Sequence, residues 1–181
     1  MATPPVFSAG AVLTASQMNK VGLWLVDEQS FSATPTWKVT SVFTSDFKNY
    51  RLVLNCTTGT GAAAQIQGQM LVGTTATGGV VYYNHLQGIM YSGTVENTSN
   101  NGASNWYCVR TNGDEWSNMF DIFNPQVAKK TFFTSLGQDT NQRYHAGGYI
   151  NNSTQYDGIQ FHNSGNHNMT GTVAVYGYRN E

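Results

Sequence analysis

The sequence is short of charge. Asp, Glu, Lys and Arg make up 10% of its 181 residues, against roughly 25% in an average globular domain. The net charge is −1, and the nine basic residues are scattered, with only Lys129 and Lys130 adjacent to each other. Because no basic stripe could follow a phosphate backbone, nucleic acid is not an expected partner.

Long apolar runs are also missing. None approaches the roughly 20 residues that a membrane-spanning helix needs, so a membrane is not an expected partner either. The stretch from Met1 to Phe7 has no basic region followed by an apolar core, and a cleaved secretory signal is therefore not expected. Together these absences predict a chain that is made in a cytoplasm and is not exported by the usual route.

Cysteine is scarce as well. The chain has two, Cys56 and Cys108, and each lies inside a predicted strand. We interpret them as small buried apolar side chains. A disulfide between neighbouring strands is the alternative, although two cysteines form no disulfide framework and a cytosolic origin argues against one.

Enzyme motifs are absent too. The sequence contains no GxSxG, Walker A loop, HExxH or CxxC. A glycosidase needs two carboxylates roughly 5–10 Å apart, and no spacing singles out such a pair, although Asp121, which alternates with Phe120 and Ile122, and Asp157 are candidates. A metal site needs several ligands in fixed geometry, and nothing selects a third ligand to join any of the scattered His85, His145, His162 and His167. The sequence predicts a non-enzymatic protein without a metal or cofactor.

What the chain does contain is typical of β-structure. Asn, Ser, Thr, Gln and Gly take the place of charge, and aromatic residues reach 13%. Between residues 49 and 57, Tyr50, Leu52, Leu54 and Cys56 alternate with polar residues, which is the period of a half-buried strand. On the order of ten such strands follow one another at roughly 8–12-residue spacing. This pattern predicts an all-β protein, an antiparallel β-sandwich of jelly-roll type formed by residues 22–181.

The last predicted strand, residues 170–179, has the clearest pattern. Val173 and Val175 lie on one face, and Gly171 and Gly177 share that face, where a missing side chain lets another backbone or a bulky ring come close. We expect this strand to lie inside a sheet, since a free edge would invite pairing with other chains. With the preceding strand at 157–162 and the turn-forming residues 163–168, it predicts a closing hairpin.

Two other stretches carry specific expectations. Asn112-Gly113 is a hairpin signal between predicted strands at 106–110 and 116–123. Residues 96–104 have almost no apolar side chains and are expected to be the longest polar loop. Predicted strands at 80–83 and 86–91 are separated by Asn84 and His85.

Residues 1–21 differ from the rest and form a predicted N-terminal arm. Pro4 and Pro5 favour extended backbone, and residues 12–20 could form one or two helical turns, with Thr14 as N-cap and Gln17 at the capping-box position. Such a short helix does not persist alone in water. The arm is therefore either a lid over one end of the sandwich or an anchor that docks on another protein, and the expected contact residues of an anchor are Pro5, Val6, Phe7, Leu13 and Met18.

Aromatic residues exceed what a small core needs. Exposed Tyr and Trp beside Asn and Gln suit a protein interface or sugar binding, whereas ordinary strand propensity explains most of them. The surplus and the low charge together predict that the chain associates with itself to cover apolar surface. The residues concerned are Trp106, Tyr107, Trp116, Tyr82, Tyr83, Tyr91, Tyr144, Tyr149 and Tyr156.

The two ends of the chain resemble a known class of proteins. Residues 5–19, PVFSAGAVLTASQMN, resemble the N-terminal segment of many tailed-bacteriophage structural proteins. Residues 170–178, TGTVAVYGY, with GIQF at 158–161 before them, resemble the closing strands of jelly-roll domains in phage fibres and capsid decoration proteins. Residues 30–155 resemble nothing that can be named. The resemblance implies a non-enzymatic virion component, often a homotrimer, with an N-terminal attachment arm.

Three functions follow as expectations. The first is a trimeric capsid decoration (cement) protein on the outer surface of the virion, made in the host cytoplasm, whose partner is the major capsid protein or another virion protein. The second is a tail-fibre tip, receptor-binding or baseplate subunit of the same fold, with a host-surface glycan as a further partner. The chain has no heptad or shaft repeat, which favours the first. The third is a carbohydrate-binding module of a glycan-degrading enzyme.

Overall fold

A computed structural model describes residues 22–58, 64–111 and 115–178, and within these ranges every regular element is a β-strand. The predicted arm, its helical turn and its contact residues Pro5, Val6, Phe7, Leu13 and Met18 lie outside the described residues. No helix in the described ranges is long and apolar enough to cross a membrane.

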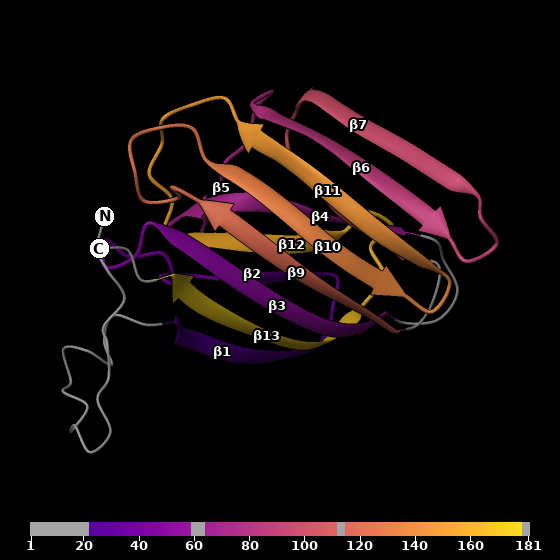
Figure 1. Ribbon diagram of the computed structural model, residues 1–181. Coiled ribbons are helices and arrows are strands. Elements are labelled where there is room, and N and C mark those ends of the chain that lie inside the picture. The colour runs from indigo at the N-terminus through magenta and orange to yellow at the C-terminus, as the bar shows by residue number, and fades with distance from the viewer. Residues whose placement is uncertain (1–21, 59–63, 112–114, 179–181) are drawn as a thin grey trace, which may run out of the picture.

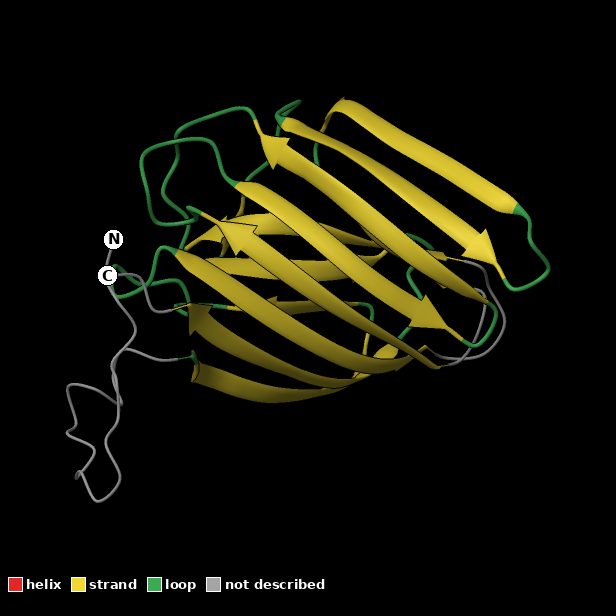
Figure 2. Cartoon of the chain, viewed as in Figure 1, coloured by secondary structure: helices red, strands yellow, loops and turns green. Residues whose placement is uncertain are grey.

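The strands form two antiparallel sheets that pack face to face (Figures 1 and 2). The eight-stranded sheet contains, in spatial order, β1 (Leu23–Thr34), β13 (Met169–Tyr178), β3 (Asn49–Thr58), β9 (Glu115–Phe123), β10 (Phe132–Asp139), β11 (Gln142–Ile150), β6 (Tyr82–Met90) and β7 (Val95–Ala103). The five-stranded sheet contains β2 (Thr36–Val39), β12 (Gly158–Asn163), β4 (Ala64–Val72) and β5 (Thr75–Ala76), with β8 (Trp106–Thr111) also paired to β4. The predicted all-β antiparallel sandwich is confirmed.

The core lies between the sheets and follows the predicted alternation. In β3, Tyr50, Leu52, Leu54 and Cys56 are all buried and face inward. The five-stranded sheet meets them with its own inward residues, among which Phe161 of β12 contacts Phe120 of the opposite sheet at 5.4 Å between ring centroids. A fully buried side chain of this size contributes about 1.5–3 kcal/mol. Both sheets are therefore held together by one continuous apolar layer.

The glycines of β13 have the role expected of them. A Cβ atom on Gly171 would lie 2.3 Å from the carbonyl oxygen of Asn55, and one on Gly177 would lie 2.3 Å from Cγ of the Phe47 ring. One glycine admits the neighbouring backbone and the other admits an aromatic ring. β13 lies between β1 and β3, so the prediction that it is not an edge strand is also confirmed.

Both predicted hairpins are wrong. β12 pairs with β2 and β4, whereas β13 pairs with β1 and β3, so the turn after β12 crosses from one sheet to the other. Likewise β8 pairs with β4, and β9 pairs with β3 and β10. Alternation specifies which face of a strand is apolar, but two strands in opposite sheets can both turn that face toward the same core. The turn-forming residues between two strands do not determine whether the second strand joins the same sheet as the first or the opposite sheet.

Two stretches expected to be loops are strands. Residues 96–104, the predicted polar loop, lie mostly in β7, an edge strand with residues polar or exposed along both faces. An edge strand needs no apolar face, and charged or polar side chains there discourage pairing with other chains. Asn84 and His85 do not separate two strands but lie within β6, because the Asn84 side chain turns inward and bonds β8. A buried polar side chain interrupts the apolar alternation without ending the strand.

The cysteines are free and buried, as interpreted from the sequence. Burial raises the pKa of Cys56 to about 12 and also raises the pKa of Cys108. The two side chains therefore act as core residues, and the thiolate form is disfavoured in the folded protein.

Candidate functional site

The outward-facing side of the eight-stranded sheet contains the candidate site. Cross-strand pairing aligns outward side chains in rows that run perpendicular to the strands. One row is apolar: Val53 of β3 pairs with Met119 of β9, which pairs with Leu136 of β10. The neighbouring row is polar and consists of Asn55, Ser117, Gln138 and Arg143 from β3, β9, β10 and β11.

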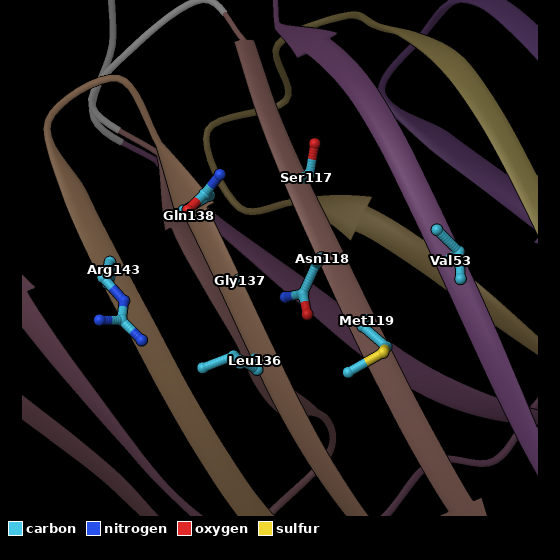
Figure 3. A pocket seen from close by; sticks show the side chains of 8 residues that line it. All are labelled: Val53, Ser117, Asn118, Met119, Leu136, Gly137, Gln138 and Arg143. Carbon is cyan, nitrogen blue, oxygen red and sulfur yellow. The ribbon is translucent and has the colours of Figure 1, made fainter.

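A hollow of about 440 Å³ lies between these two rows. Leu136 and Met119 lie at one end of it, Gln138 and Ser117 at the other, and Arg143 and Val53 on opposite flanks (Figure 3). Gly137 and Asn118, whose positions in the strands face the core, complete the lining. The volume is within the range of small-molecule sites, and no single stretch of sequence predicts it because four strands contribute to it.

The polar row offers free hydrogen-bond donors. The Ser117 hydroxyl donates to Oδ1 of Asn55 at 2.9 Å, which leaves the Asn55 amide NH2 available. Gln138 and Arg143 are exposed, and neither side chain makes a hydrogen bond or ion pair with any residue that the structure describes. Among the described residues, Arg143 therefore presents a guanidinium without an ion-pair partner at the rim of the hollow.

Asp121, one of the two candidate carboxylates, is held in an ion pair on the outer face of the eight-stranded sheet. Nε and Nη2 of Arg51 donate to its two oxygens at 2.8 and 2.7 Å, and the Tyr178 hydroxyl also donates to it. Burial opposes the charged form, but the hydrogen bonds from Arg51 and Tyr178 outweigh it, so the pKa of Asp121 is lowered. The pKa of Tyr178 rises to about 12, because burial and the adjacent carboxylate disfavour its phenolate. These contacts join β3, β9 and β13 across the outer face.

This ion pair predicts a pH dependence of stability. A carboxyl group whose folded pKa is depressed stabilises the protein above its unfolded pKa, and the stabilisation is lost as pH falls through the folded pKa. Asp121→Asn should therefore cost about 1–2 kcal/mol near pH 7 and progressively less as the pH falls below the ordinary aspartate value of about 3.9. Urea unfolding across pH 2–7 measures the difference. Glu28→Gln, which removes an exposed carboxylate on β1, should not change the profile, and a pH-independent loss in Asp121→Asn would contradict the prediction.

The other candidate carboxylates and histidines are placed apart from one another. Asp157, just before β12, accepts hydrogen bonds from the backbone N–H of Gly73 at 3.0 and 2.9 Å and so closes the turn after β4. Nε2 of His162 lies 2.7 Å from Oε1 of Gln67, and burial lowers the pKa of His162. In the part of the chain that the structure describes, no three metal-ligating side chains come together. Asp121 lies in the eight-stranded sheet and Asp157 just before β12 of the other sheet, and each has a structural contact.

Most of the surplus aromatic residues fall into two groups; of the other two, Tyr107 is partly buried against the core and Tyr91 is exposed. Most are buried in the core: Trp106, Trp116, Tyr82, Tyr144 and Tyr156. On the outer face, the Tyr83 and Tyr149 rings stack at 5.1 Å between centroids, and Phe132 lies 5.9 Å from Tyr149. The Lys130 ammonium lies 5.0 Å from the Tyr149 centroid. Strand propensity accounts for the first group, and cross-strand pairing accounts for the second.

The edge strand β1 begins with three consecutive large apolar residues. Leu23, Trp24 and Leu25 are 41%, 39% and 55% exposed, and among the described residues they pair only with residues 176–178 of β13. The opposite edge, β7, is polar along most of its length. One edge strand of the eight-stranded sheet therefore begins with an exposed apolar segment and the other is largely polar, and the two lie at opposite ends of the sheet (Figure 1).

No protein-family model matches the sequence, and no curated protein matches it. Among solved structures, the fold is similar to a K247S mutant of the GH43 protein BlXynB from Bacillus licheniformis, with a TM-score of 0.37 and 8% identity. That match covers 82% of this chain and 32% of the other, so the chain spans about a third of that protein's length. The CBM2 module of the evolved Dit of Lactobacillus casei BL23 phage J-1 matches with a TM-score of 0.22 and 7% identity, over 81% of this chain and 69% of the module. At these TM-scores the two likenesses assign no function.

Proposed function

We propose that this protein is a non-enzymatic structural component of a tailed-phage virion, and more specifically a trimeric capsid decoration protein on the outer surface of the shell. The observation that carries the proposal is the apolar edge formed by Leu23, Trp24 and Leu25. A long edge strand with exposed apolar side chains is a template for pairing with another chain. A protein whose function is assembly has a use for such an edge, whereas a solitary domain would be expected to protect it.

Two further observations support this proposal. The apolar edge begins directly after residues 1–21, the segment whose sequence resembles phage attachment arms. The two carboxylates singled out in the sequence, Asp121 and Asp157, are engaged in an ion pair and in a turn. The expected partners are two further copies of this chain and the major capsid protein, and no catalytic role is assigned to any residue.

Self-association through β1 is expected to be measurable in the isolated protein. The three exposed side chains would leave water on assembly, at roughly 25 cal/mol for each Å² of apolar surface buried. Light scattering at micromolar concentration should report a trimer, and the double substitution Leu23→Ser/Leu25→Ser should shift it to monomer. Val80→Ser, at a residue that is 76% exposed outside the edge, is the control and should remain trimeric. A monomeric wild-type protein would refute the trimer.

Deletion of residues 1–21 tests attachment to the particle. We expect the truncated protein to keep its melting temperature but to lose co-sedimentation with undecorated capsids of its phage. Three arms on one trimer would gain by multivalency, so even weak single contacts would hold the wild type firmly. Binding that survives the deletion would refute the anchor, and a strongly lowered melting temperature would identify the segment as a lid.

The tail-fibre tip or baseplate subunit is the alternative placement of the same assembly unit. Both placements need the apolar edge and a trimer, so the two are separated by location on the particle. Immunogold labelling of whole virions is expected to decorate heads for the first placement and tails for the second.

A further inference from the structure

We propose that the hollow on the outer face of the eight-stranded sheet binds a carboxylate-bearing saccharide, with Arg143 as the group that recognises the carboxylate. This site is separate from the proposed assembly edge and does not depend on the protein being a decoration subunit. It rests on three observations: the shape of the hollow, its two unlike walls, and the unpaired guanidinium at its rim.

The two walls match the two kinds of surface on a sugar ring. Val53, Met119 and Leu136 form an apolar row that can pack against the C–H face of a pyranose. Ser117 and Gln138 form the polar wall, and the Gln138 amide, which no described residue hydrogen-bonds, is open to sugar hydroxyl groups. Mostly apolar lining with a few convergent polar groups is the usual composition of a small-ligand site.

The extent of the hollow suits more than one sugar ring. It reaches from Val53 on β3 to Arg143 on β11, which are separated by three strand spacings, or about 14 Å. The walls come from the central strands of a sheet whose register is held by continuous pairing, so the hollow is largely preformed. A short oligosaccharide could therefore lie across the strands with its acidic residue beside Arg143.

Arg143 decides in favour of an acidic ligand. Arg51, the other arginine described on this face, is already paired with Asp121, whereas Arg143 makes no ion pair with any described residue. A planar guanidinium can grip a carboxylate with two parallel hydrogen bonds. A neutral sugar would make no ion pair with this guanidinium, and a flat apolar partner would bury its charge without a partner, which is unfavourable in free energy.

The test compares matched acidic and neutral saccharides. Isothermal titration with the full-length protein would use trigalacturonic acid against its methyl ester, and 3′-sialyllactose against lactose. We expect at least one acidic member to bind about tenfold or more tightly than its neutral counterpart, with affinity falling as salt is raised. Which acidic sugar binds separates the uronate class from the sialate class.

Two charge variants locate the site. Arg143→Gln should weaken binding of the preferred acid by about 10- to 100-fold, the loss expected for a hydrogen-bonded charged pair. Lys130→Gln removes the same charge from the same face but from the aromatic row beside Tyr149, and it should bind like the wild type. Leu136→Gln should weaken the acidic and the neutral sugar alike, because it alters the apolar wall that both would contact.

Three results would overturn the proposed saccharide site. Equal losses in Arg143→Gln and Lys130→Gln would show diffuse electrostatic attraction and overturn the proposal, as would equal binding of acids and esters. No binding of any acidic saccharide at millimolar concentration would overturn it as well. Unchanged melting temperatures in the variants exclude misfolding as the cause of a loss. Trimer formation and capsid attachment are measured separately, so failure here leaves the proposed function untouched.

Discussion

Gly148→Ala is expected to lower the free energy of unfolding by about 3 kcal/mol, an overpacking cost at the upper end of the usual range. A Cβ atom at this position would lie 2.1 Å from the backbone carbonyl oxygen of Tyr83 and 2.5 Å from Cβ of Asn84. Both atoms belong to the neighbouring strand β6, whose pairing with β11 fixes its position. Because backbone rather than a flexible side chain is in the way, the clash can be relieved only by separating the strands.

The adjacent glycine supplies a matched control. At Gly147 the nearest atom to an added Cβ is the Phe133 carbonyl oxygen at 3.7 Å, which is an ordinary contact. Gly147→Ala should therefore be neutral or slightly stabilising, since alanine loses less backbone entropy on folding than glycine. Urea denaturation of both variants measures the contrast, and similar stabilities would contradict the packing of β11 against β6.

Trp106→Ala is expected to cost about 3–5 kcal/mol, the range for removing a large aromatic residue from a core. Trp106 is fully buried on β8, with its ring 4.2 Å from Phe133 and 5.4 Å from Tyr82, both of the opposite sheet. The substitution would open a cavity between the two layers. Trp24→Ala removes the same side chain from an exposed edge and should change monomer stability by less than about 1 kcal/mol.

These two tryptophan variants should also differ in assembly. Trp24→Ala is expected to weaken trimer formation at protein concentrations where Trp106→Ala, if folded, still associates. Thermal unfolding and light scattering on the same samples measure both properties. A large loss of stability in Trp24→Ala would show that β1 is part of the core and not an interface.

Alternation was sufficient to predict the layers of this fold but not the pairing within them. Tyr50, Leu52 and Leu54 of β3 show the apolar period because one face of the strand is buried and the other is not. β7 shows no such period, because neither face of an edge strand needs to be apolar. The sequence predicted a break in β6 at Asn84 because asparagine is common in turns. In the structure its buried side-chain amide instead hydrogen-bonds the backbone of Tyr107, and the strand continues.

The residues that line the hollow could not be predicted from the sequence, because strand register brings them together. Val53, Met119, Leu136 and Arg143 become neighbours only through the register of three strand pairs. Each residue alone is an ordinary outward side chain on a strand. Register is a long-range property set by the whole set of paired strands, so periodicity could locate the outer face without showing which residues meet on it.

The pairing of β1 with β13 has a consequence for biosynthesis. The second strand of the sheet in space is the last strand in the chain, so the apolar residues Leu23–Leu25 have no neighbour until residues 176–178 leave the ribosome. At about 5–20 residues per second this delay is roughly 8–30 s. During that interval the nascent chain carries an unpaired apolar strand, and topologies dominated by such distant pairings fold slowly. Ribosome-bound intermediates should therefore need chaperone protection, and chains truncated before Met169 should accumulate as aggregates.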